Sequence, residues 1–486
     1  MVESNPQRYS SSSLNPESIT QYAVYYHSLN HYKMSMDAPA SLNFFKGHPS
    51  FRLLPNEEII RATTELLTPE SRDFDADTDN RHPLTYGSDP GALWVRETIC
   101  SFLNGQVFKF PKDSRMRSSA ECINLDSGAS YGMLSILLQS TLAHTGYTRQ
   151  AFIISPTYFL INNCFIDAGF AGKLTAIDEV GYDSIDFETL EKKLEEFESQ
   201  ASNNDSTGCI ENPQSDRQKK LYKYVIYLVP TYSNPSGHSY SESTRIKLIR
   251  LARKYDMLII ADDVYDILNY DQDISSDPNQ LPTPPTRFVH LDRNTRVEGK
   301  DDPFGNTISN ATFSKLIAPG LRFGYHETVT KRLAWQLSEG GANISGGTPS
   351  QLNSMIVGTM LKNGTATKVL RNLISVYKER GQVLYNNVKK YLPSKADCDV
   401  IHGGYFVWIT LPEGYDMEEI ERRLNAKYEV ILANGSNFEV IGDPKGWGRR
   451  SARLSISFME KEEIETGIKL FGSICKDYAE ELKLKF

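Results

Sequence analysis

One short stretch of the chain combines a lysine, two hydroxyl side chains and an arginine. Thr312-Phe313-Ser314-Lys315 is followed by Ala318-Pro319-Gly320-Leu321-Arg322, which contains the glycine and proline of a turn. A lysine amine forms a Schiff base with an aldehyde once its pKa is low enough for the neutral amine to exist. The planar guanidinium of arginine binds phosphate through two parallel hydrogen bonds. Each fragment alone is common on protein surfaces, but together they favour covalent attachment of an aldehyde that carries a phosphate.

Two short apolar runs predict the elements that position such a site. Residues 224–229 and 257–261 are typical of buried strands, and the pattern of residues 241–255 between them predicts a helix. Ser239 and Glu242 have the spacing of a capping box at the start of that helix. A strand, a helix and a second strand form a right-handed parallel unit, so we expect an α/β fold.

Three polar residues follow these two strands. Asn234 and Asp262 fall at the carboxyl ends of the strands, where ligands of open α/β sheets bind. An aspartate in this position can keep a pyridine nitrogen protonated, and Asn234 and Tyr265 can hydrogen-bond the phenolate oxygen of the same ring. A turn role for Asn-Pro and a helix-cap role for Asp262 are equally compatible with the residues alone.

Two further stretches have the composition of a binding site for a phosphorylated ring. The small residues at 126–132 precede the apolar run 133–138 and predict a helix start, where free N–H groups and the helix dipole favour a phosphate. Ser155-Pro156-Thr157-Tyr158 follows the predicted strand 151–154, so Tyr158 can present its ring to a flat ligand. A tyrosine packed on the core would explain the second stretch as well.

Taken together and in order, these motifs resemble a class I/II aminotransferase of the fold-type-I pyridoxal-phosphate enzymes, from about residue 42 to the C-terminus. The resemblance implies a large domain with a mostly parallel, seven-stranded-type sheet and helices on both faces, and a smaller α+β domain. It rests on Tyr86-Gly87, Ser127-Gly128-Ala129-Ser130, Pro156-Thr157-Tyr158, Asn234-Pro235-Ser236-Gly237, Asp262 to Tyr265, Ser314-Lys315 with Arg322, and Arg453 in Arg453-Leu454-Ser455-Ile456-Ser457.

The resemblance also implies a role for each site residue. Pyridoxal 5'-phosphate would be joined to Lys315, which would then move the proton at the substrate Cα; Asp262 would pair with the ring nitrogen and Tyr158 would stack on the ring. These three are the expected catalytic residues. The remaining cofactor contacts would be Asn234 and Tyr265 at the ring oxygen, Ala129, Ser130, Thr312, Ser314 and Arg322 at the phosphate, and Tyr86 from a second subunit. The substrate would be bound by Arg453 at its α-carboxylate, by the backbone of Gly47 and by Asn234.

Composition limits the alternatives. With 486 residues and 40% apolar content the chain can bury a large core, most simply in two domains. The net charge of −8 gives no electrostatic reason to expect nucleic acid or a membrane surface as partner, and no apolar run approaches the roughly 18 to 20 residues that span a bilayer. Six scattered cysteines suit a reducing compartment, and no His/Cys/Asp cluster has metal-ligand spacing, so we expect no metal.

The expected organisation has four parts: a polar extension at 1–41, a segment at 42–83 that joins the small domain, a large cofactor domain at 84–335 and a small domain at 336–486. Within the last, residues 366–392 predict a long helix, 403–411 a strand and 478–486 the end of a terminal helix. Polar segments at 200–220 and 270–310 look like insertions. The extension lacks a leader or signal-peptide pattern, so we expect a cytoplasmic protein.

The function that we expect is transfer of an amino group from 2-aminoadipate or an aromatic amino acid to 2-oxoglutarate, by a ping-pong cycle in a homodimer. The substrates, which are small molecules (an amino acid and a 2-oxo acid), are implied by the resemblance alone. Two alternatives stay open. A C–S lyase or an aminocyclopropane-carboxylate-synthase-like enzyme would use the same cofactor, and a non-catalytic regulatory homologue would have lost the reaction.

Overall fold

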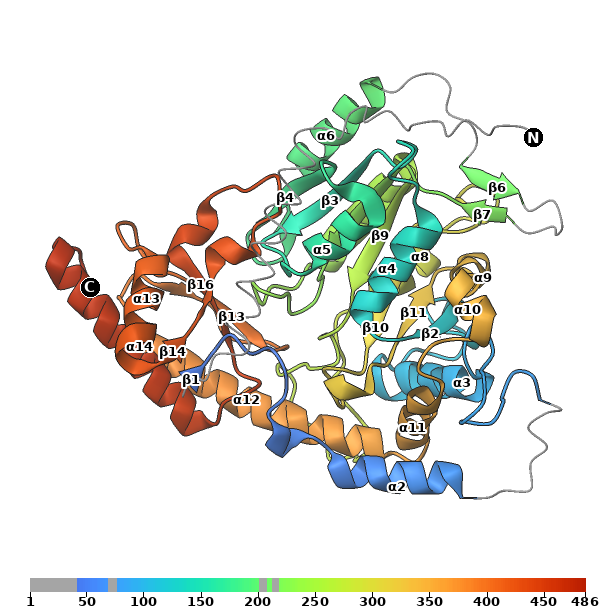
Figure 1. The fold of residues 1–486 in the computed structure, drawn as a ribbon, viewed down its shortest axis with the longest axis horizontal. Helices are drawn as coiled ribbons and strands as arrows, with labels where there is room; N and C mark the ends of the chain where they lie inside the picture. Colours follow the sequence, from blue (N-terminus) through green and yellow to red (C-terminus); the bar gives the residue numbers. More distant parts are fainter. Residues whose placement is uncertain (1–41, 69–76, 201–207, 212–217) are drawn as a thin grey trace, which may run out of the picture.

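The structure is a computed structural model that describes residues 42–68, 77–200, 208–211 and 218–486. The expected extension at 1–41 lies outside the described residues. Figure 1 shows two units, each built around its own sheet. We call the eight-stranded sheet of order β2-β11-β10-β9-β8-β3-β4-β5 the large sheet, and the four-stranded sheet of order β12-β13-β16-β15 the small sheet.

The large sheet is mostly parallel, as expected. Pairings from β10 through β9, β8 and β3 to β4 are all parallel, whereas β11 is antiparallel to both of its neighbours and the short β5 is antiparallel to β4. The strands are β2 (Ile123–Asp126), β3 (Gln150–Ser155), β4 (Leu174–Val180), β5 (Ser184–Ile185), β8 (Tyr224–Leu228), β9 (Met257–Asp262), β10 (Thr307–Thr312) and β11 (Gly324–Thr328).

Helices cover both faces of the large sheet, which explains why its strands are continuously apolar. Side chains such as Ile226 and Ile259 pack into one buried cluster with α6, α7 and α8, and their neighbours Val225 and Leu258 pack into another with α4 and α5. The helices of this unit are α3 (Leu93–Phe102), α4 (Ala129–Ser140), α5 (Ile161–Phe165), α6 (Phe187–Ser199), α7 (Glu242–Lys254), α8 (Phe288–Thr295) and α9 (Lys331–Ser338).

The small sheet is antiparallel and packs with the C-terminal helices, which gives the expected α+β unit. Its strands are β12 (Asp397–Cys398), β13 (Phe406–Thr410), β15 (Ala433–Asn434) and β16 (Ser451–Ser455), and its helices are α12 (Thr365–Tyr391), α13 (Met417–Tyr428) and α14 (Lys461–Leu482). The N-terminal strand β1 (Leu42–Asn43) pairs with β14 (Val430–Ile431) beside this unit. The domain limits at residues 84 and 336 stay a prediction.

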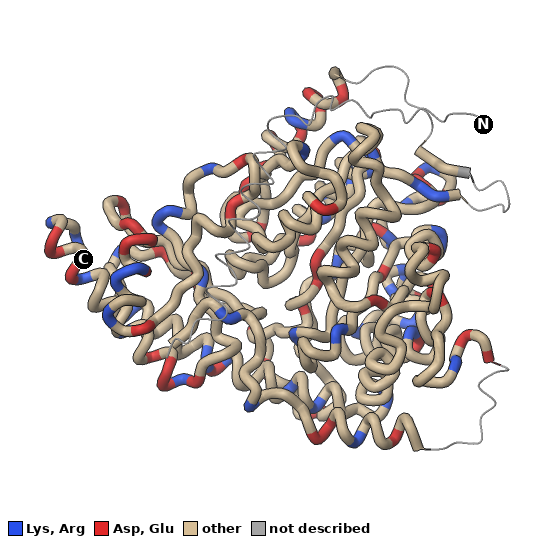
Figure 2. The backbone as a smooth tube through the Cα atoms, viewed as in Figure 1, with Lys and Arg blue, Asp and Glu red and all other residues tan. Residues whose placement is uncertain are grey.

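The remaining elements are short or connect the units. Helix α2 (Asn56–Leu67) packs against α11 (Gln351–Lys362), which also contacts α3. Other helical segments are α10 (Gly341–Gly346), the 3-10 turns η1 (Phe51–Leu53), η3 (Ala120–Cys122), η5 (Pro319–Leu321), η6 (Gly435–Phe438) and η7 (Trp447–Arg450), and the π-turns η2 (Leu103–Val107) and η4 (Ile166–Phe170). No helix in the described ranges is long and apolar enough to cross a membrane. Acidic and basic positions are interspersed along the described chain (Figure 2).

The structure contradicts two local predictions, the cap of α7 and the end of the terminal helix. The start of α7 is capped by Ser241, whose side chain accepts the N–H of Thr244, so the capping box predicted from Ser239 and Glu242 is wrong. Ser239 instead accepts the N–H of Tyr232 and closes the loop before the helix. The terminal helix ends at Leu482, before the expected residue 486.

The two segments that look like insertions both contain regular structure. The described part of 200–220 forms an antiparallel pair, β6 (Cys209–Glu211) with β7 (Gln218–Lys220). The segment 270–310 contains α8, whose residues Phe288 and Leu291 pack into the core of the large sheet. The second segment is therefore part of the large unit and not only a surface addition.

Candidate active site

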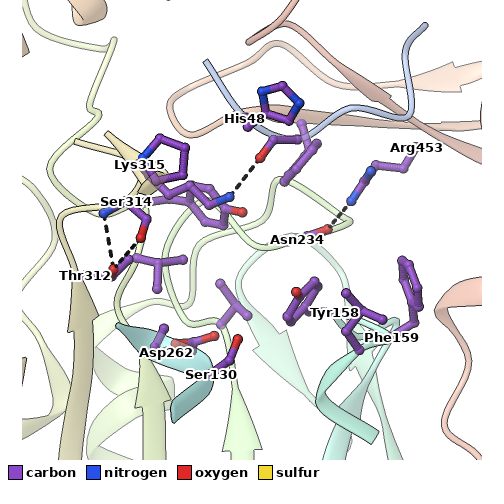
Figure 3. A pocket seen from close by; sticks show the side chains of 18 of the residues that line it. His48, Ser130, Tyr158, Phe159, Asn234, Asp262, Thr312, Ser314, Lys315 and Arg453 are labelled. Carbon is purple, nitrogen blue, oxygen red and sulfur yellow. Dashed lines mark hydrogen bonds between the residues drawn. The ribbon is translucent and has the colours of Figure 1, made fainter. Parts of the chain in front are cut away.

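A cavity of about 220 Å³ lies where the carboxyl ends of the parallel strands face the small sheet. It is lined by every predicted site residue except Tyr86 (Figure 3). These residues are Gly47, Ala129, Ser130, Tyr158, Asn234, Asp262, Tyr265, Thr312, Ser314, Lys315, Arg322 and Arg453. Segments far apart in the sequence therefore meet in one cleft.

Lys315 stands in the turn after β10. Its Nζ donates a hydrogen bond of 2.8 Å to the backbone carbonyl of Gly47, and its own carbonyl accepts the hydroxyl of Tyr405 at 2.8 Å. Burial, together with the nearby positive charge of Arg453, lowers the pKa of Lys315 to about 8. A large fraction of this amine is therefore neutral at mildly basic pH, which a nucleophile or a general base requires.

Asp262 is the last residue of β9, and its carboxylate is held on both oxygens. The hydroxyl of Tyr227 donates to Oδ2 at 2.8 Å, and Nδ2 of Asn310 donates to Oδ1 at 3.0 Å. Asn310 lies directly opposite Asp262 in the pairing of β9 with β10. Burial raises the pKa of Asp262 to about 6, although both hydrogen bonds oppose this shift. A cationic partner in the cleft would restore full ionisation.

The start of α4 converges with the turn that carries Arg322. Gly128 has a φ of +94°, and a Cβ built there would lie 3.4 Å from Nη2 of Arg322 and 3.6 Å from Oγ1 of Thr312. Arg322 itself adopts the left-handed conformation directly after η5. A helix start, a guanidinium and a hydroxyl thus surround one small space, which fits a phosphate group.

Arg453 on β16 is buried, and hydrogen bonds to the loop after β8 and to the segment after β1 hold its guanidinium. Its Nη1 donates to Oδ1 of Asn234 at 3.0 Å and its Nη2 donates to the carbonyl of Phe45 at 2.6 Å. The rings of Phe406 and Phe438 lie 4.0 and 4.9 Å from the guanidinium carbon. Figure 3 shows Arg453 and Asn234 joined across the cleft. A cation fixed in this way can bind a carboxylate with little further loss of entropy.

Two tyrosines of the predicted set lie in the cleft and one does not. The ring of Tyr158 borders the cavity, and Tyr265 is buried beside Asn234, where burial raises its pKa above the ordinary value. Tyr86 is 75% exposed and lies against α10, since a Cβ on Gly346 would come within 3.0 Å of its ring. Within one chain Tyr86 does not reach the cleft.

The sequence motifs do not predict the phenylalanines that line the cleft or the residues that hydrogen-bond Asp262. Phe45, Phe159 and Phe406 line it with aromatic rings, and Tyr227 and Asn310 hold Asp262 from below. The aromatic residues look like ordinary core positions in the sequence. The available signal for Asn310 is the composition of Thr307 to Thr312, where four of six residues are polar although the strand is buried throughout.

The model of the family "Aminotransferase class I and II" matches residues 66–470. The chain belongs to the class I and II aminotransferases. It is therefore a transaminase, and its cofactor is pyridoxal phosphate. The residues of the cleft fit this group, because a buried lysine, a buried carboxylate and a phosphate-sized space border one cavity.

Three further comparisons show what the chain is similar to in sequence and in fold. An uncharacterized protein of Saccharomyces cerevisiae is 61% identical over 438 residues, which are 90% of this chain and 97% of that protein. Aromatic-amino-acid aminotransferase 1 of Thermococcus litoralis is 27% identical over 256 residues, 52% of this chain and 54% of that enzyme, so the match spans about half of each. The crystal structure of the multiple substrate aminotransferase from Thermococcus profundus shares the fold, with a TM-score of 0.69 and 22% identity over 93% of this aminotransferase and 95% of that chain.

Proposed function

We propose that this aminotransferase moves the amino group of an aromatic amino acid to 2-oxoglutarate by a ping-pong cycle, with 2-aminoadipate as a second class of donor. The observation that carries the proposal is the division of charges in the cleft. Lys315, Asp262 and Arg322 suit the cofactor, and Arg453, fixed by Asn234, suits the α-carboxylate of the substrate.

The cofactor, when bound, supplies an aldehyde that accepts the amino group and a ring that withdraws electrons from the substrate Cα. Asp262 keeps the ring nitrogen protonated, because a buried carboxylate with a raised pKa is stabilised by a cationic partner. Lys315, neutral at mildly basic pH, takes the proton from the substrate Cα. Arg453 holds the α-carboxylate so that this proton faces the amine.

The walls of the cleft support an aromatic donor. Phe45, Phe159 and Phe406 border the space beside Arg453, and aromatic rings pack well against one another. Once the charges above are assigned, His48 is the remaining side chain of the described lining that could become a cation, and burial lowers its pKa, so it is neutral at neutral pH. A side-chain carboxylate, whether of 2-aminoadipate or of 2-oxoglutarate, would thus find no further cation among these residues. This lining favours the aromatic donor and makes a monocarboxylate 2-oxo acid the acceptor to compare with 2-oxoglutarate.

A donor panel tests this proposal. Purified holoenzyme is incubated with 2-oxoglutarate and one donor at a time (tyrosine, phenylalanine, 2-aminoadipate, alanine), and glutamate is measured. We expect aromatic donors to give the highest kcat/KM, and parallel double-reciprocal lines. No glutamate from any donor would contradict the proposal, and release of pyruvate and ammonia from cystathionine would favour the lyase alternative. A monocarboxylate 2-oxo acid in place of 2-oxoglutarate tests the acceptor.

We also propose a homodimer in the cytoplasm. The exposure of Tyr86 outside the cleft of its own chain supports a role at the phosphate site of a second subunit, and all six cysteines are free, as suits a reducing compartment. Light scattering of the holoenzyme measures the assembly. An active monomer would contradict it.

A further inference from the structure

The loop after β8 connects the cleft with a second cavity on its far side. Asn234 faces the cleft, and His238, a few residues along the same loop, lines a cavity of about 560 Å³ together with Asp399 and His402. Between them Gly237, at a φ of +78°, passes so close to β13 that a Cβ there would lie 3.1 Å from the carbonyl of Phe406. The loop therefore contacts the small sheet at Gly237, beside β13, and at Asn234, which Arg453 of β16 hydrogen-bonds.

A buried carboxylate ties this loop to the large sheet. Glu179 near the end of β4 accepts hydrogen bonds from the hydroxyls of Ser236 at 3.1 Å and Tyr240 at 2.9 Å. Its other oxygen lies 2.8 Å from Nδ1 of His238, and only 4% of its side chain is exposed. Three side chains of one loop thus converge on a single carboxylate, which fixes the loop conformation.

The imidazole of His238 stands between carboxylates from the two units. Its Nε2 lies 3.7 Å from Oδ2 of Asp399, which follows β12 of the small sheet, while its Nδ1 meets Glu179 of the large sheet. Asp397 on β12 adds a further negative charge, and the ring of Tyr182 packs edge-on at 5.2 Å. The other charged or titratable side chains that border the cavities around His238 are Asp178, Asp183, Tyr232, Asp271, His402, Tyr415, Arg449 and Arg450.

We propose that His238 is a positioning residue for binding of the substrate carboxylate. As a cation it bridges Glu179 and Asp399 and so holds the Asn234 loop against the small sheet, which keeps Asn234 in contact with Arg453. The inference rests on the proposed role of Arg453 and adds a residue outside the cleft to it.

The protonation of His238 gives this role a pH dependence. Burial alone would lower its pKa, but the hydrogen bond with Glu179 and the charges of Glu179 and Asp399 outweigh burial, so its pKa is raised above 6.5. The cation is therefore present on the acid side and is lost as the pH rises through the raised pKa. Affinity for a carboxylate ligand falls in the same direction.

The experiment uses the holoenzyme and 3-phenylpropionate, a carboxylate without an amino or keto group that stays ionised throughout. Its Kd is measured by calorimetry from about pH 6 to about pH 9 for the wild type and for His238→Gln. We expect the Kd of the wild type to rise about fivefold over this range, the size of one ordinary net hydrogen bond, and the Kd of His238→Gln to be high and nearly independent of pH. With an aromatic donor, KM follows the same pattern while kcat changes little.

Two further variants separate positioning from a general effect on the fold. His402→Gln removes another histidine of the same cavity, one that pairs with Asp271 and makes no bond to the loop, and should retain the wild-type profile. Asp399→Asn removes the carboxylate at the small-sheet end of the bridge, so it should raise the Kd on the acid side and move the midpoint of the Kd profile to lower pH. It also serves as the test if His238→Gln does not fold.

The outcomes distinguish this inference from the proposed function. Normal turnover with superimposable Kd profiles for the wild type, His238→Gln and Asp399→Asn would overturn the inference alone. A wild-type holoenzyme that forms no glutamate and binds no carboxylate would overturn the proposed function and this inference with it. A flat profile confined to His238→Gln, with a shifted one for Asp399→Asn, supports it.

Discussion

The ion pairs beneath α8 and the cleft both contain several buried charges, but the charges in the two regions have different kinds of partner. Beneath α8, the Nε and Nη2 of Arg287 donate to the two oxygens of Asp266 at 2.7 and 3.2 Å, and its Nη1 donates to the hydroxyl of Tyr325 at 3.0 Å. Arg293 donates to Glu327 at 2.9 Å in the same group. In the cleft, by contrast, Lys315 donates to a neutral carbonyl and Asp262 accepts from two neutral groups.

The directions of the pKa shifts follow from these partners. Burial would raise the pKa of Glu327, but the facing charges of His290, Arg293 and Arg287 outweigh it and hold this pKa well below its ordinary range. The charges of Asp266 and Asp263 likewise outweigh burial at Arg287, whose pKa lies well above the ordinary value. In the cleft burial prevails, with Asp262 at about 6 and Lys315 at about 8.

The contrast between the two regions shows that buried charges can serve either stability or chemistry, depending on their partners. A buried ion pair with matched partners stays ionised and locks the chain that it joins. A buried charge without a matched partner is poised to change its protonation state or to bind a charged ligand. Asp263, adjacent to Asp262 and 3.9 Å from Arg287, lies at the border of the two regions, and burial raises its pKa to about 7.

Replacing the lysine of the cleft should have the largest effect. We expect Lys315→Ala to lower kcat by about 10⁴-fold, the upper end of what a positioned proton-transfer group supplies, with little change in stability. Covalent attachment of pyridoxal phosphate should be lost as well, which mass spectrometry after borohydride reduction detects. Lys46→Ala, on the segment that faces Lys315, is the control and should keep both properties. Retained turnover in Lys315→Ala would remove the basis of the proposed function.

We call the ion pairs of Arg287 and Arg293 with Asp266 and Glu327 the paired region. Substitutions in the paired region should change the stability of the protein and not its turnover. Arg287→Met leaves the carboxylate of Asp266 without its cation and removes the more distant of the two arginines beside Glu327, so we expect the free energy of unfolding to fall by about 3 to 5 kcal/mol. Chemical denaturation monitored by circular dichroism measures this. Arg422→Met breaks an exposed pair with Glu419 and should leave the denaturation midpoint unchanged. Equal midpoints for the two variants would contradict the contrast between the regions.

The sequence predicts most of the sheet and the motifs of the cleft, because both depend on local patterns. Strands buried on both faces appear as continuous apolar runs, and residues 224–229 and 257–261 are accordingly found as β8 and β9. The cap of α7 is not predictable in this way, since Ser239 and Ser241 are both cap residues by type. The choice between them depends on how the preceding loop folds back onto Tyr232.

The residues that hold Asp262 in place depend on the register between strands, which local sequence patterns do not reveal. Whether Asn310 or a neighbour meets Asp262 is decided by the alignment of β10 with β9, which no local pattern encodes. Arg287 lies in a segment that looks like an insertion, although its guanidinium is buried and contacts three carboxylates of the paired region. Sequence motifs thus indicate residues that line the cleft, and the structure supplies the residues that hold them in place.

The comparison makes opposite predictions for two aspartates in the cofactor-free protein. The folded pKa of Asp262, about 6, lies above the ordinary value of 3.8, so the native state is favoured below about pH 4 and loses that advantage as the pH rises through about 6. Asp262→Asn removes this ionisation, and we expect it to raise the free energy of unfolding at neutral pH by about 1 to 3 kcal/mol. The gain should vanish near pH 4. Asp266→Asn, which deprives Arg287 of its bidentate partner, should destabilise the protein at neutral pH. Denaturation midpoints of both variants at these two pH values decide the matter, because a loss of stability in Asp262→Asn would mean that the carboxylate of the cleft is as well paired as the one beneath α8.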